Sequence, residues 1–308
     1  MSFRIACIID TEGWAWDRTS RELLTAGPSI SGEVFLAKDI HNLYEKLCHQ
    51  FDVIIVYPWA AKDLLRVLEP LAFKTIVCNC SGAHNNKESI ENFRKWIKHF
   101  KFIGANNEII RNLYQSAFPE KCVIVLSHGV DIERFYPDPI RAPPIDQELV
   151  LGWAGNASRE LKRFDKAQKI VEILMSKGIK VNFKPAIYGT ESQIPMDEMP
   201  NYYRTLNAFL ITSRAEAHPL VAYEAMASGL PLVTTNVGDL NDTVINGVNG
   251  VILDVDTPAK KFADVLWQLC QTTSVAKRMG RAARQTILQR WSWPAVLPQY
   301  ETLIQLVR

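Results

Sequence analysis

The stretch SRAEAHPLVAYEAMASGLPLVTTNVGDLNDTVINGVNGVILD, from Ser213 to Asp254, determines the predicted fold. It follows NAFLIT (207–212), a short apolar run that is typical of a buried parallel strand. A helix is predicted from Pro219 to Ser228, because proline suits a first helical position and Gly229 suits the residue just past a helix end. PLVTT (231–235) reads as another buried strand, so the stretch predicts an open α/β sheet.

The predicted helix start suggests an anion site. The first backbone N–H groups, near Leu220 and Val221, have no partner within a helix, and the positive end of the helix dipole lies behind them. Glu216 lies just before this point, and Glu224 follows about one and a half turns into the helix. Carboxylates accept hydrogen bonds from vicinal hydroxyls, so a phosphate flanked by two polyols, as in a nucleotide sugar, fits this pattern. Taken singly, each acid is better explained as an ordinary solvated residue, but the placements of Glu216, Pro219, Glu224 and Gly229 agree with one another.

This stretch resembles the Glu-x7-Glu signature of retaining GT-B glycosyltransferases of family 4. Their usual pattern is E-G-x-P-L-x-x-x-E-A-M-A-x-G-x-P-V-V, followed by a loop with G-x-x-G. Ala217 replaces the usual glycine, and His218 replaces an aromatic or small residue. The matching positions are Glu216, Pro219, Leu220, Glu224, Ala225, Met226, Ala227, Gly229, Pro231, Gly247 and Gly250.

Composition sets bounds on the class of protein. A chain of 308 residues that is 47% hydrophobic is long for one domain, so two domains are expected. Residues 1–140 hold 16 Lys and Arg against 17 Asp and Glu, and residues 141–308 hold 19 against 16, so neither half is basic enough to require a nucleic-acid partner. Six cysteines without a Cys-x2-Cys pair, no signal-peptide pattern and no apolar run near ~20 residues indicate a cytoplasmic protein.

The resemblance implies an α/β fold of the GT-B type, with two Rossmann-like domains that face each other across a cleft. Strands alternate with helices over residues 1–140, which predicts a parallel sheet and an acceptor-side domain. RAPPIDQE (141–148) is Pro-rich and is predicted to be the linker. Residues 149–293 then form the nucleotide-sugar domain, and a C-terminal helix, about 294–308, crosses back to the first domain.

Acceptor-side candidates lie after the first predicted strand. Gly13, Trp14 and Trp16 stand where the family has a Gly-rich loop. The two tryptophans could stack on a sugar or a base, or fill the space between domains. The resemblance also suggests that a histidine in the loop after the fourth strand reaches the donor sugar, which makes His84 a catalytic candidate, although a lone loop histidine is more often solvated.

A basic amphipathic helix is predicted near residues 90–101. Five basic residues stand against two acidic ones between Lys87 and Lys101, with Phe93, Trp96, Ile97 and Phe100 at helical spacing. Related enzymes dock on anionic lipid through such a helix, which would make the protein peripheral to the membrane. The alternative, which we favour, is an ordinary helix whose apolar stripe faces the sheet.

The second domain opens with a strand, a loop with Gly155 and a long helix. Lys162 near the helix start could meet a diphosphate. The family pairs this lysine with an arginine six positions earlier, where this chain has Asn156; Arg159 or Arg163 could substitute. The resemblance also places the loop near Ile194 beside the nucleobase, with contacts largely through backbone atoms.

The predicted activity is therefore a retaining, metal-independent glycosyl transfer without a cofactor, from a UDP- or GDP-sugar. Glu216 and Lys162 are its catalytic candidates with His84. Glu224 would hold the ribose, and Gly155, Asn156, Ile194, His218, Leu220 and Val221 complete the donor-binding set. The resemblance leaves the acceptor open: a glycan, a lipid-linked sugar, a small molecule or a modified nucleic-acid base. Asp254 and Asp256 are interpreted as turn and cap residues rather than metal ligands.

Two alternatives remain open. The same fold could serve a nucleotide-sugar epimerase or hydrolase, which would act on the donor without an acceptor. The loss of a phosphate-binding arginine at Asn156 could instead indicate a catalytically weak nucleotide-sugar-binding protein.

Overall fold

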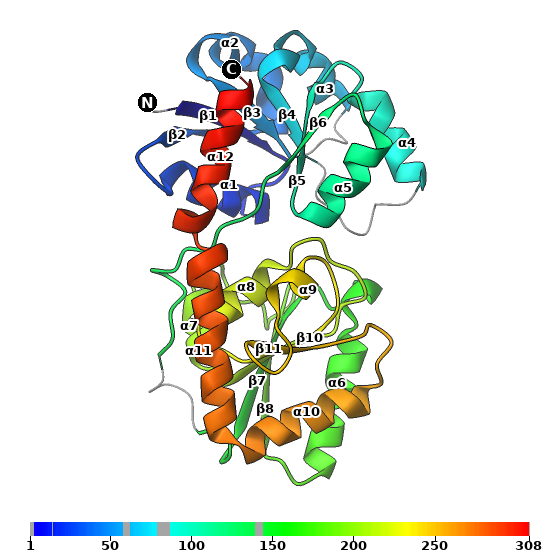
Figure 1. Cartoon of the computed structure of the whole chain (residues 1–308), viewed down its shortest axis with the longest axis vertical. Coiled ribbons are helices and arrows are strands. Elements are labelled where there is room, and N and C mark those ends of the chain that lie inside the picture. Colours follow the sequence, from blue (N-terminus) through cyan, green and yellow to red (C-terminus); the bar gives the residue numbers. More distant parts are fainter. Residues whose placement is uncertain (1–2, 14, 58–61, 79–86, 139–143, 308) are drawn as a thin grey trace. The chain divides into compact units, whose positions relative to one another are not determined.

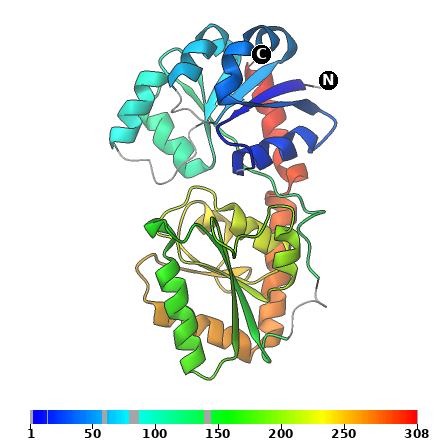
Figure 2. The ribbon, with the colours of Figure 1, turned by 180° about the vertical axis from the view of Figure 1, so that it is seen from behind.

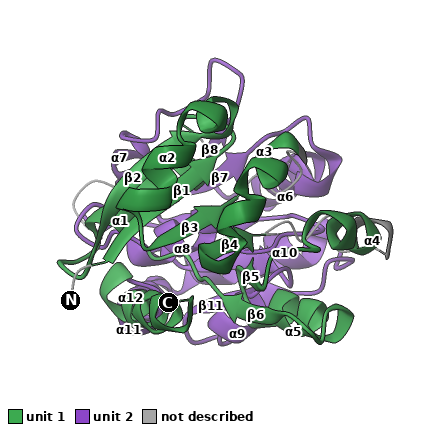
Figure 3. Ribbon diagram, turned by 90° about the horizontal axis from the view of Figure 1, so that it is seen from above, with its two compact units in different colours: residues 1–129, 293–308 green, residues 130–292 purple. Residues whose placement is uncertain are grey.

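The computed structural model describes residues 3–13, 15–57, 62–78, 87–138 and 144–307. Contacts divide the chain into two compact units, residues 1–129 with 293–308 and residues 130–292 (Figure 3). The chain enters the second unit at Val130 and leaves it after Ser292. These two points are adjacent in the second unit, because the Val130 N–H donates to the Trp291 carbonyl at 2.8 Å. Val130 and Phe135 belong to the second core, so the division falls before the linker predicted at 141–148.

The first unit is a six-stranded parallel sheet. Its strands are β1 (Phe3–Ile9), β2 (Ile30–Leu36), β3 (Val53–Val56), β4 (Thr75–Cys78), β5 (Phe102–Ala105) and β6 (Cys122–Val125), in the order β2-β1-β3-β4-β5-β6. Each pair is parallel, as the alternation of strands and helices predicts. The helices are α1 (Ala15–Thr25), α2 (Tyr44–Gln50), α3 (Lys62–Leu68), α4 (Lys87–Trp96) and α5 (Glu108–Ala117).

The C-terminal helix α12 (Trp293–Val307) belongs to this first unit, as predicted (Figure 1). It packs with Leu23 of α1 on alternate residues of β1, among them Ile5 and Cys7, which point to one face of the sheet. Two hydrogen bonds add specificity: the Tyr300 hydroxyl donates to the Ser127 carbonyl at 3.0 Å, and the Trp293 indole donates to Glu22 at 2.9 Å. Residues near the start of the chain and residues of its C-terminal helix therefore share one hydrophobic core.

A buried lysine holds the end of α2. The Lys74 ammonium, 7% exposed, donates to the carbonyls of Leu47, Cys48 and Phe51 at 2.9, 2.8 and 2.8 Å. These carbonyls lie at the C-terminal end of the helix, where a cation also meets the negative end of the helix dipole. Burial lowers the pKa of Lys74 from its usual 10.5, while Cys48 and Asp52 oppose the shift.

Replacing Lys74 with methionine is expected to lower the free energy of unfolding by about 2–4 kcal/mol, because buried carbonyls lose charged donors. Urea denaturation measures the change, with exposed Lys95→Met as the control. Since the pKa of Lys74 is lower in the folded state, the unfolded state binds more protons just below pH 10.5, and the contribution of Lys74 to stability should rise with pH there. Equal stability of the two variants would contradict this account.

The second unit has a five-stranded parallel sheet. Its strands are β7 (Leu149–Gly155), β8 (Val181–Ile187), β9 (Ala208–Ile211), β10 (Leu232–Thr235) and β11 (Gly250–Leu253), in the order β11-β10-β9-β7-β8. Its helices are α6 (Phe164–Ser176), α7 (Met199–Arg204), α8 (Leu220–Ala227), α9 (Leu240–Thr243), α10 (Ala259–Gln271) and α11 (Thr273–Arg290). The strand order changes direction at β7, and ligands of open α/β sheets bind at such a point.

Helices cover both faces of this second sheet. Leu149, Leu151 and Trp153 of β7 point toward α6 and α10, whereas Val150 points toward the core that includes residues of α7, α8 and α11. Figures 1 and 2 show α6 and α10 together on one side of the sheet and α11 on the other. The α/β fold with two parallel sheets is therefore confirmed.

Candidate functional site

The helix α8 begins within one residue of the prediction. Pro219 is its N-cap rather than its first helical residue, and Gly229 adopts a left-handed φ of 75° after its end. The Ala222 N–H already donates to the Pro219 carbonyl at 2.8 Å. Among the described residues, the backbone N–H groups of Leu220 and Val221 have no such bond, so both are available to an anion.

Lys162 and Glu216, fifty-four positions apart in sequence, meet beside this helix start. The Lys162 ammonium lies 2.6 Å from Glu216 Oε1, and the Ser213 hydroxyl donates to the same oxygen at 2.6 Å. The lysine side chain is 23% exposed and the glutamate 14%, so both reach solvent. The structure thus brings together two of the residues that the sequence assigned to the donor.

The two loops that supply this pair are joined by hydrogen bonds. The Thr212 hydroxyl at the end of β9 donates to the carbonyls of Lys162 and Arg163, at 3.0 and 2.9 Å, and the Arg214 N–H donates to Leu161 at 2.7 Å. Arg163 is the one non-glycine residue of the described chain with a positive φ, at 50°. This turn places Lys162 against Glu216 while the Arg163 side chain lines a separate cavity.

Glu224 lies on α8 and is 2% exposed. Its Oε2 accepts a hydrogen bond from the Tyr203 hydroxyl at 2.8 Å, and Tyr203, on α7, is fully buried. Tyr203 therefore fixes the carboxylate that the sequence assigned to a ribose. Sequence reasoning missed Tyr203, because nothing in the local pattern of α7 distinguishes a tyrosine that bonds a carboxylate from one that packs in a core.

His218 is buried away from solvent. Its side chain is 0% exposed, its Nδ1 lies 2.6 Å from Asp239 Oδ2, and its ring stacks on Tyr223 at 4.1 Å. Burial, followed by the Asp239 carboxylate, raises the pKa of Tyr223. This cluster fixes the loop that ends at Pro219, so a donor contact at His218 would have to come from its backbone.

Gly155 is the last residue of β7, and Asn156 begins the loop that follows. The Asn156 side chain accepts from the Ser158 N–H at 2.9 Å and from its hydroxyl at 2.7 Å, so it stabilises its own turn. A Cβ atom at Gly155 would lie 3.2 Å from the Trp153 ring, which is a tight contact, so glycine suits this position beside the Lys162 side chain. Arg159 is exposed, and Ile194 is partly buried against the second core.

The acceptor-side candidates of the first unit are only partly described. Gly13 has a φ of 77°, and its N–H donates to Asp17 at 2.8 Å. The Trp16 ring stacks on Tyr57 at 4.5 Å and contacts His128 at 4.9 Å. Its packing thus lies within the first unit. Trp14 and His84 lie outside the described residues.

The predicted basic helix ends earlier than expected, at Trp96. Phe93, Ile97 and Phe100 are buried in the first unit, so their apolar stripe packs on the domain rather than facing outward. In the described chain, no helix is both long enough and apolar enough to cross a membrane. Asp254 and Asp256 lie in a turn, as predicted, which is closed by a bond from the Thr257 N–H to the Asp254 carbonyl at 2.9 Å. The predicted cap role is wrong, because the N-cap of α10 is Pro258 and no side chain caps it.

A comparison with known protein families matches part of the second unit. Residues 190–286, which include Glu216, Glu224 and Tyr203, match the family described as glycosyl transferases group 1. These residues form a group 1 glycosyltransferase domain. The two-unit architecture of the chain matches the GT-B fold of such enzymes.

Relatives of this glycosyltransferase domain include D-inositol 3-phosphate glycosyltransferase from Frankia alni, 29% identical over 54% of this chain and 37% of the relative. The chain therefore spans well under two thirds of that relative. Two solved structures cover nearly the whole chain at 14% identity. Sucrose-phosphate synthase from Thermosynechococcus elongatus has a TM-score of 0.72 and covers 99% of both chains, and Anabaena HepE in complex with UDP and glucose has a TM-score of 0.75 and covers 98% and 99%.

Proposed function

We propose that this chain transfers a sugar from a nucleotide diphosphate sugar to an acceptor, with retention of configuration and without a metal or a cofactor. The supporting observation is the ion pair of Lys162 with Glu216 just before α8, whose first amides, those of Leu220 and Val221, have no backbone hydrogen bond among the described residues. A cation and a dipole-positive helix start suit a diphosphate, while carboxylates suit hydroxyls.

Each residue of the proposed site would bind a different part of the donor. Lys162 and the two amides would stabilise the charge that develops on the departing diphosphate, which is usually the largest catalytic contribution. Glu216 would hold hydroxyls of the transferred sugar, and Glu224 those of the ribose. UDP is the favoured nucleotide, because solved relatives of the same fold contain UDP or UDP-glucose.

In this proposal the acceptor oxygen attacks from the face that the leaving phosphate occupies. The bond between the anomeric carbon and the phosphate oxygen breaks, a bond to the acceptor oxygen forms on the same face, and the acceptor proton passes to the leaving phosphate. No separate base is then required. The first unit would present the acceptor, and contact of α4 with anionic lipid through its exposed cations remains part of the hypothesis.

A thermal-shift panel of UDP-, GDP-, ADP- and CMP-sugars tests the donor, because a ligand that binds the folded state raises the melting temperature. We expect selective stabilisation by one nucleotide, UDP first. Incubation with that donor alone separates the alternatives: an epimer or abundant free sugar would indicate an epimerase or hydrolase. Absence of stabilisation by every donor would contradict the proposal.

Tyr203 provides a test of how Glu224 is positioned. Tyr203→Phe removes the 2.8 Å hydrogen bond to Glu224, together with a longer one of 3.3 Å to the Val221 carbonyl, and keeps the ring that packs against Phe135 and Phe209. We expect the Kd for the nucleotide to rise about threefold to tenfold, the effect of one hydrogen bond. Titration calorimetry measures it. Tyr202→Phe, next in sequence but bonded to the backbone of Trp153 and Lys184, is the matched control, and an equal loss in both variants would show a merely structural role.

A further inference from the structure

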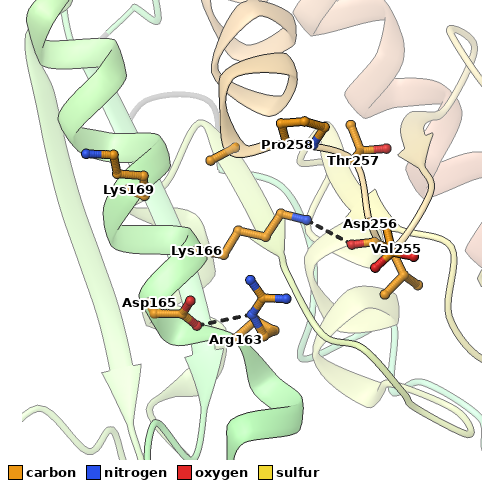
Figure 4. Close-up of a pocket in the computed structure, with 9 residues that line it drawn as sticks. Arg163, Asp165, Lys166, Lys169, Val255, Asp256, Thr257 and Pro258 are labelled. Atoms are coloured by element: carbon orange, nitrogen blue, oxygen red, sulfur yellow. Dashed lines mark hydrogen bonds and ion pairs between the residues drawn. The ribbon is translucent and has the colours of Figure 1, made fainter.

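A cavity of about 360 Å³ lies in the second unit between the starts of α6 and α10 (Figure 4). Its walls come from the first turns of α6 and from the turn between β11 and α10. The lining is polar and mainly basic, with three cations and two carboxylates: Arg163, Lys166, Lys169, Asp165 and Asp256. A cavity of this size accommodates a small molecule.

Lys166 is the central feature of the cavity. The residue is 6% exposed, and its ammonium extends across the cavity to donate to the Val255 carbonyl at 3.0 Å (Figure 4). The ring of Phe262 lies 4.5 Å from the same nitrogen. An ammonium has three protons, and the described residues provide one hydrogen-bond acceptor, so two donors remain for a ligand or water.

Positive charge is crowded at this point. Burial lowers the pKa of Lys166, and the neighbouring Arg163 lowers it further, while Asp256 and Asp165 oppose the shift. The ion pair of Arg163 with Asp165 is long, with Nε 3.3 Å from the carboxylate oxygen. The first turns of two thirteen-residue helices, α6 and α10, add the positive ends of their dipoles. An anion in the cavity would relieve this crowding.

The cavity and the proposed donor site are lined by consecutive residues, Arg163 and Lys162. The left-handed turn at Arg163, held by the Thr212 hydroxyl, places consecutive cations differently: Lys162 pairs with Glu216, and Arg163 lines the cavity. We propose that this cavity binds a second phosphate-bearing small molecule, distinct from the donor, through Arg163 and Lys166, whereas the Lys169 ammonium at its edge pairs with Glu172 at 2.8 Å. Asp165 and Asp256 at its wall suit the hydroxyls of a phosphorylated polyol.

The test uses inorganic phosphate and glycerol 1-phosphate, with glycerol and sodium chloride as controls for the polyol and for ionic strength. Binding is followed as the rise in melting temperature of the full chain. The key variant is Arg163→Asn with Lys166→Gln, because asparagine tolerates the left-handed backbone at position 163 and glutamine keeps a donor for the Val255 carbonyl. Lys277→Gln, an exposed lysine on α11, is the matched control, and Lys162→Gln removes the cation of the donor site.

We expect phosphate to stabilise the wild type, Lys277→Gln and Lys162→Gln alike, and the double variant to require at least about tenfold more phosphate. Glycerol 1-phosphate should bind more tightly than phosphate if the carboxylates contact hydroxyls. No stabilisation of the wild type, or equal stabilisation of the double variant, would overturn the proposal. Loss of the stabilisation by phosphate only in Lys162→Gln would assign the phosphate to the donor site and would also overturn the proposal. If phosphate still stabilised Lys162→Gln but no nucleotide sugar bound the wild type, the phosphate site in this cavity would be supported and the proposed donor function would fail.

Discussion

Lys162→Met is expected to lower kcat about 10²-fold to 10³-fold while changing the affinity for the donor far less. The reason is that Lys162 would act mainly on charge that develops as the diphosphate departs, and removing one such group costs about 3–4 kcal/mol in the transition state. Methionine keeps the apolar stem beside Gly155 and removes the ammonium that lies 2.6 Å from Glu216. Initial rates at saturating donor, with the donor selected by the thermal-shift panel, measure the change.

Lys277→Met, on the exposed face of α11, is the control for the loss of a lysine in the same unit. Its rates should match those of the wild type. If Lys162→Met retained the wild-type kcat, Lys162 would not stabilise the leaving group. If instead only the KM rose, the lysine would bind ground state and transition state equally.

Glu224→Ala should weaken nucleotide binding about 10-fold to 100-fold, with a smaller effect on the rate at saturation. One hydrogen bond from a ribose hydroxyl to a carboxylate contributes about 1.5–3 kcal/mol, which corresponds to a change in Kd of this size. Calorimetric titration with the free nucleotide diphosphate measures the loss. Because the diphosphate lacks the sugar, this experiment isolates the ribose and phosphate contacts.

Glu216→Ala provides the contrast for that measurement. Glu216 would contact the transferred sugar, so its removal should leave the affinity for a free nucleotide diphosphate within a few-fold of the wild type. Removal of this carboxylate also frees Lys162 from its 2.6 Å ion pair, which can only favour a phosphate. Equal losses in the two variants would refute the division of the donor between them.

The fold was largely predictable, because buried parallel strands are continuous apolar runs and helix ends have recognisable residues. The pattern around Pro219 and Gly229 located α8 to within one residue. The unit boundary was not predictable from composition: RAPPIDQE has the composition of a linker, yet Val130 and Phe135 are already in the second core. Burial by distant residues leaves no local signal.

The site was predictable where one motif supplies the residues and not where distant elements do. Glu216, Glu224 and the α8 amides belong to one stretch, so the sequence alone placed them before and along one helix. Tyr203 on α7 lies outside that stretch, and only the packing of the sheet brings its hydroxyl to Glu224. Asp239 lies in the same stretch as His218, but no spacing rule predicts their contact across the intervening helix and strand.

The consequence of having asparagine at position 156 could not be predicted from the sequence alone. Sequence reasoning noted the loss of an arginine and considered Arg159 or Arg163 as replacements. The structure shows Asn156 bonded within its own turn, Arg159 exposed and Arg163 lining the α6–α10 cavity. The left-handed backbone of Arg163, which sends adjacent side chains to different places, has no signature in the sequence because glycine is the usual residue there.

The most direct test of the central claim is a crystal structure of the chain with the nucleotide diphosphate that stabilises it most. The account predicts the ribose hydroxyls within hydrogen-bond distance of Glu224, and the diphosphate on the Lys162 ammonium and the amides of Leu220 and Val221. A nucleotide bound elsewhere, with Glu216 and Glu224 making no contact with it, would contradict the account.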